Sequence, residues 1–266
     1  MKKILSALLT IVIISTLSGC GAKKEVAVAD KKVIKVGASP VPHKEILELV
    51  KPILAKEGYT LEIVEFTDYV TPNTALAEKQ LDANFFQHVP YLQSFSKERN
   101  LDLDYTVKVH LEPMGLYSNK YKKLSDLKDG AEIAIPNDPT NGARALRVLE
   151  KAGLLKLKSG DLISKLDITE NPRKFKITEL DAPQLPRVLK DLDAAVINSN
   201  FALEAKLNSS DALVTESKDS PYANVLAVRK EDKEKSYIKA LSKSLNSSEV
   251  KKFILDKYKG AIIPAF

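Results

Sequence analysis

The spacing of apolar and polar positions switches repeatedly along the chain between the period of a strand and that of a helix. Residues 33–37 have a strand pattern that runs into Ser39-Pro40. Apolar residues then recur at helical spacing from Ile46 to Leu54, and this pattern stops at Gly58. Residues 61–66 form the next strand pattern. Strand, helix and strand at these distances predict a βαβ unit, and hence a mostly parallel sheet with helices packed on it.

The alternation continues through the rest of the chain. Further helices are predicted at residues 72–79, 90–99, 140–152, 233–245 and 248–258, and further strands at residues 81–86, 105–110, 114–117, 132–135, 175–177, 194–197 and 225–228. Thr140 is the candidate N-cap of its helix because a hydroxyl can accept a hydrogen bond from the first turn. The pattern predicts an α/β fold and fits two lobes. We expect crossovers near residues 110–114 and 218–224, which place residues 32–111 and 222–266 in lobe 1 and residues 112–221 in lobe 2.

The N-terminal segment determines the expected compartment. Lys2 and Lys3 precede an apolar run over residues 4–17, which meets Ser18-Gly19-Cys20. A membrane span needs about 20 apolar residues, so this shorter run with a basic start predicts a signal peptide over residues 1–19. Residues 17–20 resemble the bacterial lipobox, and Cys20 is the only cysteine of the chain. We expect a lipid on Cys20, a flexible tether over residues 20–31, and anchoring at the extracytoplasmic face of the cell membrane.

Charge and cysteine content narrow the function class. The chain has 41 Lys and Arg against 35 Asp and Glu, and its net charge of +6 falls to +4 when Lys2 and Lys3 are removed. Both signs are interspersed, and no basic block with interleaved aromatic residues occurs, so nucleic-acid binding is not predicted. An exported chain with a single cysteine has no disulfide framework, so its stability depends on packing.

Motifs for catalysis and metal binding are missing from the sequence. No cysteine besides Cys20 is present for thiol chemistry, and the three histidines, His43, His88 and His110, lie 45 and 22 residues apart, without the short spacing of a zinc site. No GxSxG, P-loop or GxGxxG motif occurs. We therefore predict no metal, no cofactor and no enzymatic activity; a serine triad assembled at long range leaves a lipid-anchored enzyme as the remote alternative.

The remaining signal lies in turn and aromatic segments that follow predicted strands. In open α/β sheets, ligands bind beyond the carboxyl ends of the strands. Aromatic walls with a few amides and one charge suit a small zwitterion with an apolar tail. Four segments are distinctive strings: DANFFQHVPYL (82–92), EPMGLYS (112–118), IAIPNDPTN (133–141) and SPYAN (220–224).

These strings resemble those of the methionine-binding lipoproteins of ABC importers, the NlpA family, and the resemblance runs from about Lys35 to the C-terminus. It implies a two-lobe periplasmic-binding-protein-like fold (type II) that closes on a ligand in the cleft between the lobes. It also implies that the chain binds L-methionine and delivers it to a membrane permease with its ATPase. A methionine-containing dipeptide, D-methionine or methionine sulfoxide are alternative ligands, and we expect a monomer.

The resemblance also implies roles for individual residues. It places the ligand thioether among Tyr69, Phe86, His88 and Tyr91, the carboxylate at Arg144, and the head group at Asn200 and Asn224, with Asn141 and Asn198 as further candidates. The chain departs from the commoner pattern at residues 140–144, where a Glu-Gly pair is usual, and at Pro183. The first departure keeps Arg144 in register, but the residue at which its helix starts is not determined by the resemblance.

Each candidate also has an interpretation without a ligand. Phe85 and Phe86 are neighbours on a predicted strand and face opposite sides, so one of them belongs to the core, and we expect Phe86 in the pocket. His88 can simply cap the helix that follows, and Asn198 can do the same for the next helix. Arg144 shares a stripe at helical spacing with Arg147, which is typical of a solvated face; we favour the pocket because Arg144 lies in the predicted first turn, where the helix dipole also attracts an anion.

Overall fold

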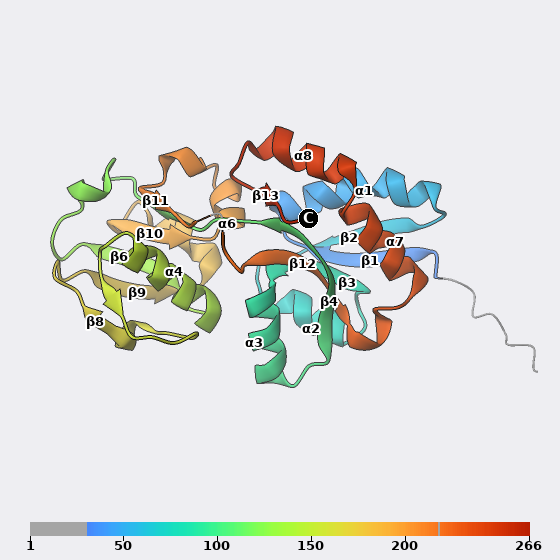
Figure 1. Cartoon of the computed structure of the whole chain (residues 1–266), viewed down its shortest axis with the longest axis horizontal. Coiled ribbons are helices and arrows are strands. Elements are labelled where there is room, and N and C mark those ends of the chain that lie inside the picture. Colours follow the sequence, from blue (N-terminus) through green and yellow to red (C-terminus); the bar gives the residue numbers. More distant parts are fainter. Residues whose placement is uncertain (1–30, 218) are drawn as a thin grey trace, which may run out of the picture. The chain divides into compact units, whose positions relative to one another are not determined.

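Two β-sheets organise the described part of the chain, residues 31–217 and 219–266 of this computed structural model (Figure 1). The first sheet has the strand order β13-β4-β12-β3-β1-β2, the second has the order β11-β5-β10-β6-β9, and β7 pairs with β8. The strands are β1 (Val33–Ala38), β2 (Thr60–Glu65), β3 (Ala83–His88), β4 (Leu103–Leu111), β5 (Gly115–Tyr117), β6 (Glu132–Pro136), β7 (Lys156–Leu157), β8 (Ile168–Glu170), β9 (Lys176–Leu180), β10 (Ala194–Ile197), β11 (Val214–Thr215), β12 (Ala223–Arg229) and β13 (Ile263–Pro264). The helices are α1 (Glu45–Lys56), α2 (Thr71–Ala77), α3 (Val89–Arg99), α4 (Pro139–Lys151), α5 (Leu185–Val188), α6 (Ser199–Glu204), α7 (Ser236–Leu245) and α8 (Ser248–Tyr258), with short helical turns such as η1 (Pro40–Lys44) between them.

The first sheet is assembled from both ends of the described chain. β1 pairs in parallel with β2 and with β3, as the predicted βαβ unit requires. β12 comes from the C-terminal part and lies antiparallel between β3 and β4, and β13 pairs antiparallel with β4. β1 to β4 therefore share one direction while β12 and β13 run against them. The α/β class is confirmed, and the sheet is mixed.

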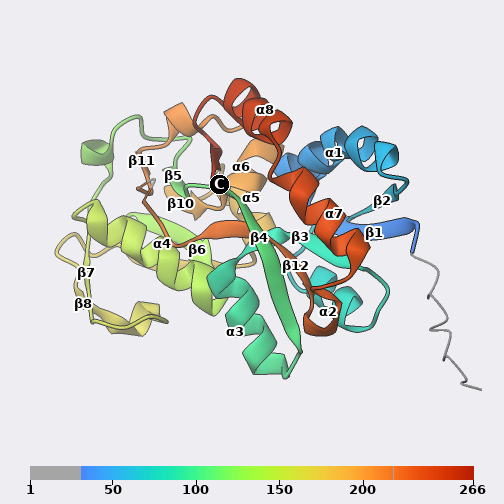
Figure 2. The same ribbon diagram turned by 45° about the vertical axis from the view of Figure 1, so that its right-hand side comes forward.

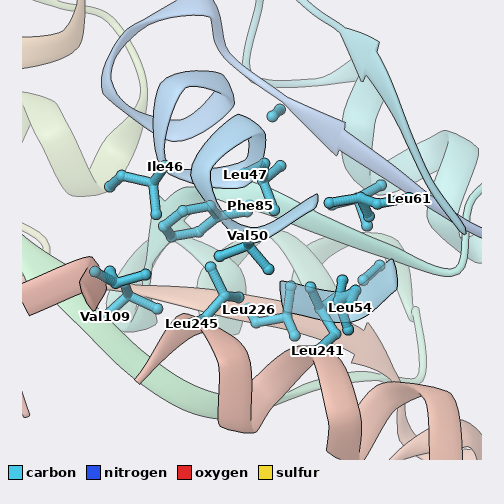
Figure 3. Packing of buried hydrophobic residues seen from close by; sticks show 14 of the residues in the cluster. Ile46, Leu47, Val50, Leu54, Leu61, Phe85, Val109, Leu226, Leu241 and Leu245 are labelled. Atoms are coloured by element: carbon cyan, nitrogen blue, oxygen red, sulfur yellow. The ribbon is translucent and has the colours of Figure 1, made fainter. Parts of the chain in front are cut away.

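Helices cover both faces of this sheet, with α1, α7 and α8 on one face and α2 and α3 on the other (Figures 1 and 2). Four of the apolar positions of α1 (Ile46, Leu47, Val50 and Leu54) are buried, and Leu47 and Val50 pack near Phe85 of β3 and Leu241 of α7 (Figure 3). The packing confirms that Phe85 belongs to the core, where its side chain is fully buried.

The second sheet has a parallel centre and antiparallel additions. β6 pairs in parallel with both β9 and β10, whereas β5 lies antiparallel to β10 and β11 antiparallel to β5. The apolar face of α4 packs on one side of this sheet, and α5 and α6 pack on the other. β10 is buried at all four positions, as its continuous apolar sequence predicted for a central strand.

The chain passes from the first sheet to the second between β4 and β5, and it returns between β11 and β12. We call the elements around the first sheet lobe 1 and those around the second sheet lobe 2. The residue limits predicted for the lobes, 32–111 with 222–266 for lobe 1 and 112–221 for lobe 2, stay a prediction.

The predicted start of α4 is wrong. The helix begins at Pro139, and its N-cap is Asp138, whose side chain accepts a hydrogen bond from the Asn141 amide. A carboxylate two residues earlier than Thr140 satisfies the first turn, and Pro139 suits the first helical position because it has no N–H to satisfy. The short helices α5 and α6 and the strands β7, β8, β11 and β13 were missed, since two to six residues show too little periodicity to be recognised.

The predicted signal peptide over residues 1–19, the lipid on Cys20 and the tether up to residue 30 lie outside the described residues. Within residues 31–217 and 219–266, no helix has both the length and the apolar content that a membrane crossing requires.

Candidate functional site

A pocket with about 320 Å³ of empty space, open solvent included, lies between the two lobes, at the ends of strands from both sheets. The structure brings all nine predicted ligand-binding residues together in its wall, and it adds three that the sequence did not single out, Gln87, Glu112 and Ser199. The predicted set comprises Tyr69, Phe86, His88, Tyr91, Asn141, Arg144, Asn198, Asn200 and Asn224.

One end of the cavity is aromatic. Tyr69, from the loop before α2, has its ring centroid 5.8 Å from that of Phe86 on β3 and 5.8 Å from that of Tyr91 on α3. The Tyr91 hydroxyl donates to the Tyr69 carbonyl at 2.9 Å, which fixes the two rings relative to each other. Such edge and tilted contacts are favourable ring geometries, so this end is a pre-packed apolar wall.

His88 joins the aromatic end to lobe 2. Its Nδ1 accepts a hydrogen bond from the Tyr91 amide at 3.1 Å. His88 therefore caps α3, which was the interpretation of this residue without a ligand. Because Nδ1 accepts, we assign the proton to Nε2, which lies 3.1 Å from Oδ1 of Asn141. Burial lowers the pKa of His88 to about 3, and the Arg144 charge acts in the same direction. The imidazole is therefore neutral at pH 7 and donates across the cavity.

The amides of lobe 2 are only partly satisfied. Oδ1 of Asn141 accepts from His88 and from Nδ2 of Asn198, the latter at 2.9 Å, and Oδ1 of Asn200 accepts from the Tyr69 hydroxyl at 2.6 Å. Oδ1 of Asn198 and Nδ2 of Asn200 are buried and have no hydrogen-bond partner among the described residues. Buried polar atoms of this kind are rare without a function.

The alternative interpretation of Asn198 as a side-chain cap is wrong. Asn198 occupies the N-cap position of α6, but its side chain accepts no hydrogen bond from the helix and turns to Asn141 instead. An unpaired acceptor and an unpaired donor thus lie in the cavity wall, on residues two positions apart at the start of α6. A ligand with both a donor and an acceptor fits them.

Arg144 is buried, with 2% of its surface exposed, so the solvated-stripe interpretation is wrong. Its Nε lies 3.0 Å and 3.1 Å from the two carboxylate oxygens of Glu216, and its Nη2 donates to Glu216 and to the Glu112 carbonyl. The Tyr222 ring lies 4.3 Å from the guanidinium carbon. These contacts engage Nε and Nη2, and no hydrogen bond joins Nη1 to another of the described residues.

The reason given for Arg144 from the sequence needs correction. Because α4 starts at Pro139, Arg144 lies in its second turn, and Asp138 already occupies the amides of the first turn. The helix terminus is therefore not an open anion site here. Arg147, one turn further, is partly exposed and donates to the carbonyls of Gly160 and Asp161. The two arginines of the stripe have different environments.

Below the amides, Glu112 lies between two histidines. Its Oε1 is 2.7 Å from Nε2 of His110 and 3.1 Å from Nε2 of His43, and His43 Nε2 is also 3.1 Å from Oδ1 of Asn224. Ser39 lies 2.6 Å from His43 Nδ1, so the proton of His43 belongs on Nε2, where both acceptors are. Burial lowers the pKa of His43 to about 4 and that of His110 to about 3, and burial raises the pKa of Glu112.

His43, His110 and Glu112 are the side chains of the described residues whose composition suits a metal, with donor atoms within 4.8 Å of one another. Nε2 of His110 lies 2.7 Å from Oε1 of Glu112 in a hydrogen bond, whereas Nε2 of His43, 3.1 Å from the same oxygen, bonds to Oδ1 of Asn224. Donors around a tetrahedral zinc lie about 3.3 Å apart, given bonds of about 2.0–2.1 Å. The cluster is therefore explained as a hydrogen-bonded group that ties η1 and β4 to the crossover segments.

The three additional residues differ in whether the sequence could have indicated them. Glu112 lies in the EPMGLYS string, two residues after His110, and this nearness to a buried-strand histidine is a signal that could have identified it. Gln87 bonds to Asn73 and Asn84, an internal amide network. Ser199 donates to the Pro113 carbonyl and so connects α6 to the crossover. The partner of Arg144, Glu216, lies 72 positions away, and no sequence pattern indicated it.

Two α/β lobes joined by two crossovers, with a pocket at the strand ends of both, have the arrangement of a substrate-binding protein of the two-lobe type. The sequence comparisons agree with this class. A family model described as NlpA lipoprotein matches residues 34–266. The chain belongs to the NlpA lipoprotein family.

Individual relatives are similar over nearly the whole chain. The methionine-binding lipoprotein MetQ of Bacillus subtilis (strain 168) is 42% identical over 277 aligned residues, with 99% of both chains covered. The D-methionine-binding lipoprotein MetQ of Salmonella typhi is 43% identical, with 88% of this chain and 87% of that relative covered. Among solved structures, a nutrient binding protein from Burkholderia cenocepacia bound to methionine is 48% identical, with a TM-score of 0.85 over 88% of this chain and all of that one.

Proposed function

We propose that this chain binds methionine in the cavity between its lobes and delivers it to the permease and ATPase of an ABC importer. The observation that carries the proposal is the division of the cavity into an aromatic end and a polar end with unpaired buried atoms. The names of the relatives, and the structure that was solved with methionine, support the same ligand.

The two ends suit the two parts of methionine. The thioether lies among Tyr69, Phe86, His88 and Tyr91 in this proposal, since sulfur–aromatic contacts contribute about 0.3–1.5 kcal/mol each. The carboxylate lies at Nη1 of Arg144 and Nδ2 of Asn200, which are donors that the internal contacts leave over. Binding involves no covalent step, so the proposed function is transport without catalysis.

The stereochemistry of the ligand is part of the proposal. We propose L-methionine, with D-methionine, methionine sulfoxide and a methionine-containing dipeptide as competitors, because relatives named for methionine and for D-methionine are about equally similar to this chain. Titration calorimetry of the purified protein with each ligand tests this. L-methionine should bind tightest; leucine binding as tightly as methionine would contradict the proposal, and a tighter fit to D-methionine would change the ligand but not the class.

We further propose that Cys20 carries the lipid that holds the protein at the extracytoplasmic face of the membrane, as the family name suggests. Cys20→Ala should release the protein into the soluble fraction and abolish labelling with a fatty acid, with methionine binding unchanged. Membrane retention of the unlabelled variant would refute the anchor and leave the ligand assignment intact.

A further inference from the structure

The C-terminal segment accounts for the positive charge of residues 31–266. Residues 235–266, which include α7 and α8, contain seven lysines against two acidic residues, so their net charge is +5. Residues 31–234 together have a net charge of −1. Such a difference between two parts of one chain indicates a surface that meets an anionic partner.

The lysines of α7 and α8 lie on the sides of the helices that face away from the first sheet. Ile238 of α7 and Ile254 of α8 are fully buried in the core beneath them. Lys239 and Lys243, one helical turn apart, are 60% and 82% exposed, and Lys251 of α8 is exposed as well. The two helices therefore form an outer layer of lobe 1 with a basic outer surface (Figures 1 and 2).

An apolar side chain lies within this basic surface. Leu255 of α8 is 51% exposed, the highest value for a large apolar side chain among the described residues of lobe 1. Lys251 and Lys252 precede it by one helical turn and Lys259 follows it by one turn, so lysines lie on both sides of it. Basic residues around an exposed apolar side chain are the pattern of a helix that lies on the surface of a bilayer.

The described chain begins beside these helices. Nζ of Lys31 lies 5.9 Å from the ring centroid of Tyr237 in the first turn of α7, and β1 starts next to α7 in both views (Figures 1 and 2). Lys31 follows Cys20 by 11 positions, which a fully extended chain spans in at most about 40 Å. A lipid on Cys20 therefore keeps this end of lobe 1 close to the bilayer.

From these observations we infer that the outer surface of α7 and α8 lies on anionic phospholipid headgroups and orients the anchored protein on its membrane. We call this surface the basic face, and its residues are Lys235, Lys239, Lys243, Lys251, Lys252, Leu255 and Lys259. The inference rests on the proposed lipid on Cys20, because a short tether makes the contact intramolecular, and a weak attraction is then sufficient. None of these residues lines the pocket between the lobes, so the contact leaves ligand binding open.

The test anchors residues 20–266 to vesicles by coupling the Cys20 thiol to a maleimide lipid. Cys20 is the only cysteine, so the coupling occurs at one position. It anchors the protein whether or not cells attach a lipid there, and failure of the proposed anchor is thereby distinguished from failure of this inference. Acetylation of lysines, measured by mass spectrometry, compares vesicles of phosphatidylcholine alone with vesicles in which about a third of the lipid is phosphatidylglycerol.

The lysines of the basic face should react at least about threefold more slowly on the anionic vesicles, since each lysine near such a surface gains about fivefold in affinity. Lys122, Lys123 and Lys128 of lobe 2 are also exposed, and their reactivity should not change. Salt at about 1 M, which shortens the Debye length to about 3 Å, should abolish the protection.

Two matched triple variants test the lysines themselves. Lys239→Gln, Lys243→Gln and Lys251→Gln combined should abolish the protection of Lys252, and the ion pairs lost with them are on the surface, so the fold should persist. The control replaces the three lobe 2 lysines by Gln, which removes the same charge, and it should keep the protection of Lys252.

Unchanged reactivity of the basic face on anionic vesicles overturns the inference. Equal protection on phosphatidylcholine overturns it as well, because the tether alone would then orient the protein. Protection of the lobe 2 lysines instead would place a different surface on the membrane, and protection that occurs only in membranes of the producing cells would assign the basic face to a protein partner; both results overturn the inference. If the triple variant of the basic face does not fold, the lipid and salt comparisons with the parent decide the matter.

Discussion

The aromatic end and the polar end of the cavity differ in how complete they are. The rings of Tyr69, Phe86 and Tyr91 contact one another and all come from lobe 1, and only Tyr69 also reaches lobe 2, where its ring lies 5.1 Å from that of Phe201, so most of this wall is packed within one lobe. The polar end combines Glu112 with Asn198 and Asn200, and it includes a buried donor and a buried acceptor that have no partners among the described residues. A wall whose side chains already pack on one another selects a ligand by shape. A polar wall with unpaired atoms is stabilised mainly when the ligand pairs with those atoms. Affinity should therefore depend on the polar end and selectivity on the aromatic end.

The largest effect is expected from Arg144→Ala. Losing one partner of a buried charge pair costs about 2–5 kcal/mol in binding, or roughly 30- to several-thousand-fold in affinity. The variant also leaves Glu216 buried and unpaired, so the free energy of unfolding should fall by about 3–5 kcal/mol. Calorimetry and urea denaturation measure the two quantities. Arg147→Ala is the control, because its carbonyl contacts lie outside the cavity; equal losses of affinity in both variants would refute the assignment of Arg144.

Replacing Phe86 probes selectivity at the other end. A misfitted methylene costs about 1–3 kcal/mol, so the parent should discriminate methionine from leucine by roughly 10- to 200-fold. Phe86→Ala widens the wall and should remove most of this ratio. Phe95 stacks on Tyr91 at 5.8 Å without lining the cavity, so Phe95→Ala should keep the methionine-to-leucine ratio. Competition binding with methionine and leucine measures this ratio. An unchanged ratio in Phe86→Ala would refute the assignment of selectivity to the aromatic end.

His88, at the boundary of the two ends, should contribute to the pH dependence of stability. Its pKa is lowered to about 3 in the folded protein, against about 6.5 when unfolded. The unfolded chain therefore binds the extra proton first as the pH falls, so the stabilisation present above pH 6.5 is lost on acidification. Between pH 7.5 and pH 5 the loss is about 2 kcal/mol.

His88→Asn keeps a capping side chain at the start of α3 and removes the titrating ring. Urea denaturation at both pH values should show a shallower pH dependence for this variant by that amount. An identical slope in the parent and the variant would show that His88 is not held neutral.

The smallest effect concerns the hydrogen bonds of the two tyrosines. The Tyr69 hydroxyl crosses from lobe 1 to Asn200 of lobe 2, whereas the Tyr91 hydroxyl bonds within lobe 1. Each bond contributes about 1 kcal/mol. Tyr69→Phe should weaken ligand binding about fivefold, because the bond forms between the lobes, and Tyr91→Phe should lower stability but not affinity. Parallel calorimetry and denaturation of the two variants distinguish these outcomes.

The parts of the fold that the sequence predicts are those with long periodic patterns. The helices α1 and α4 have apolar residues at helical spacing over three turns or more, and this stripe alone determines the buried face. The order β13-β4-β12-β3 could not be predicted in the same way, because β12 and β13 pair with strands more than 100 residues earlier in the chain, and β13 has two residues. Local pattern has no information on such partners.

The candidate site shows the same limit. The nine residues were identified through the family resemblance, five of them within its four strings (Phe86, His88, Tyr91, Asn141 and Asn224), and the structure brings all nine to one cavity. Their pairing was not predictable: Glu216 holds Arg144 across 72 positions of the chain. An ion pair leaves no periodic trace in a sequence, since either partner alone is indistinguishable from a surface charge.

The location of the Glu112 cluster has a consequence for the order of events. His43, His110 and Asn224 lie on η1, β4 and β12, which all belong to lobe 1, as do the aromatic side chains. Arg144, Asn198 and Asn200 belong to lobe 2. If methionine binds as proposed, separation of the lobes keeps the thioether contacts together on lobe 1 and removes the carboxylate contact at Arg144. Release would then have two steps: opening breaks the Arg144 contact, and the half that keeps the ligand sets the rate at which it finally leaves.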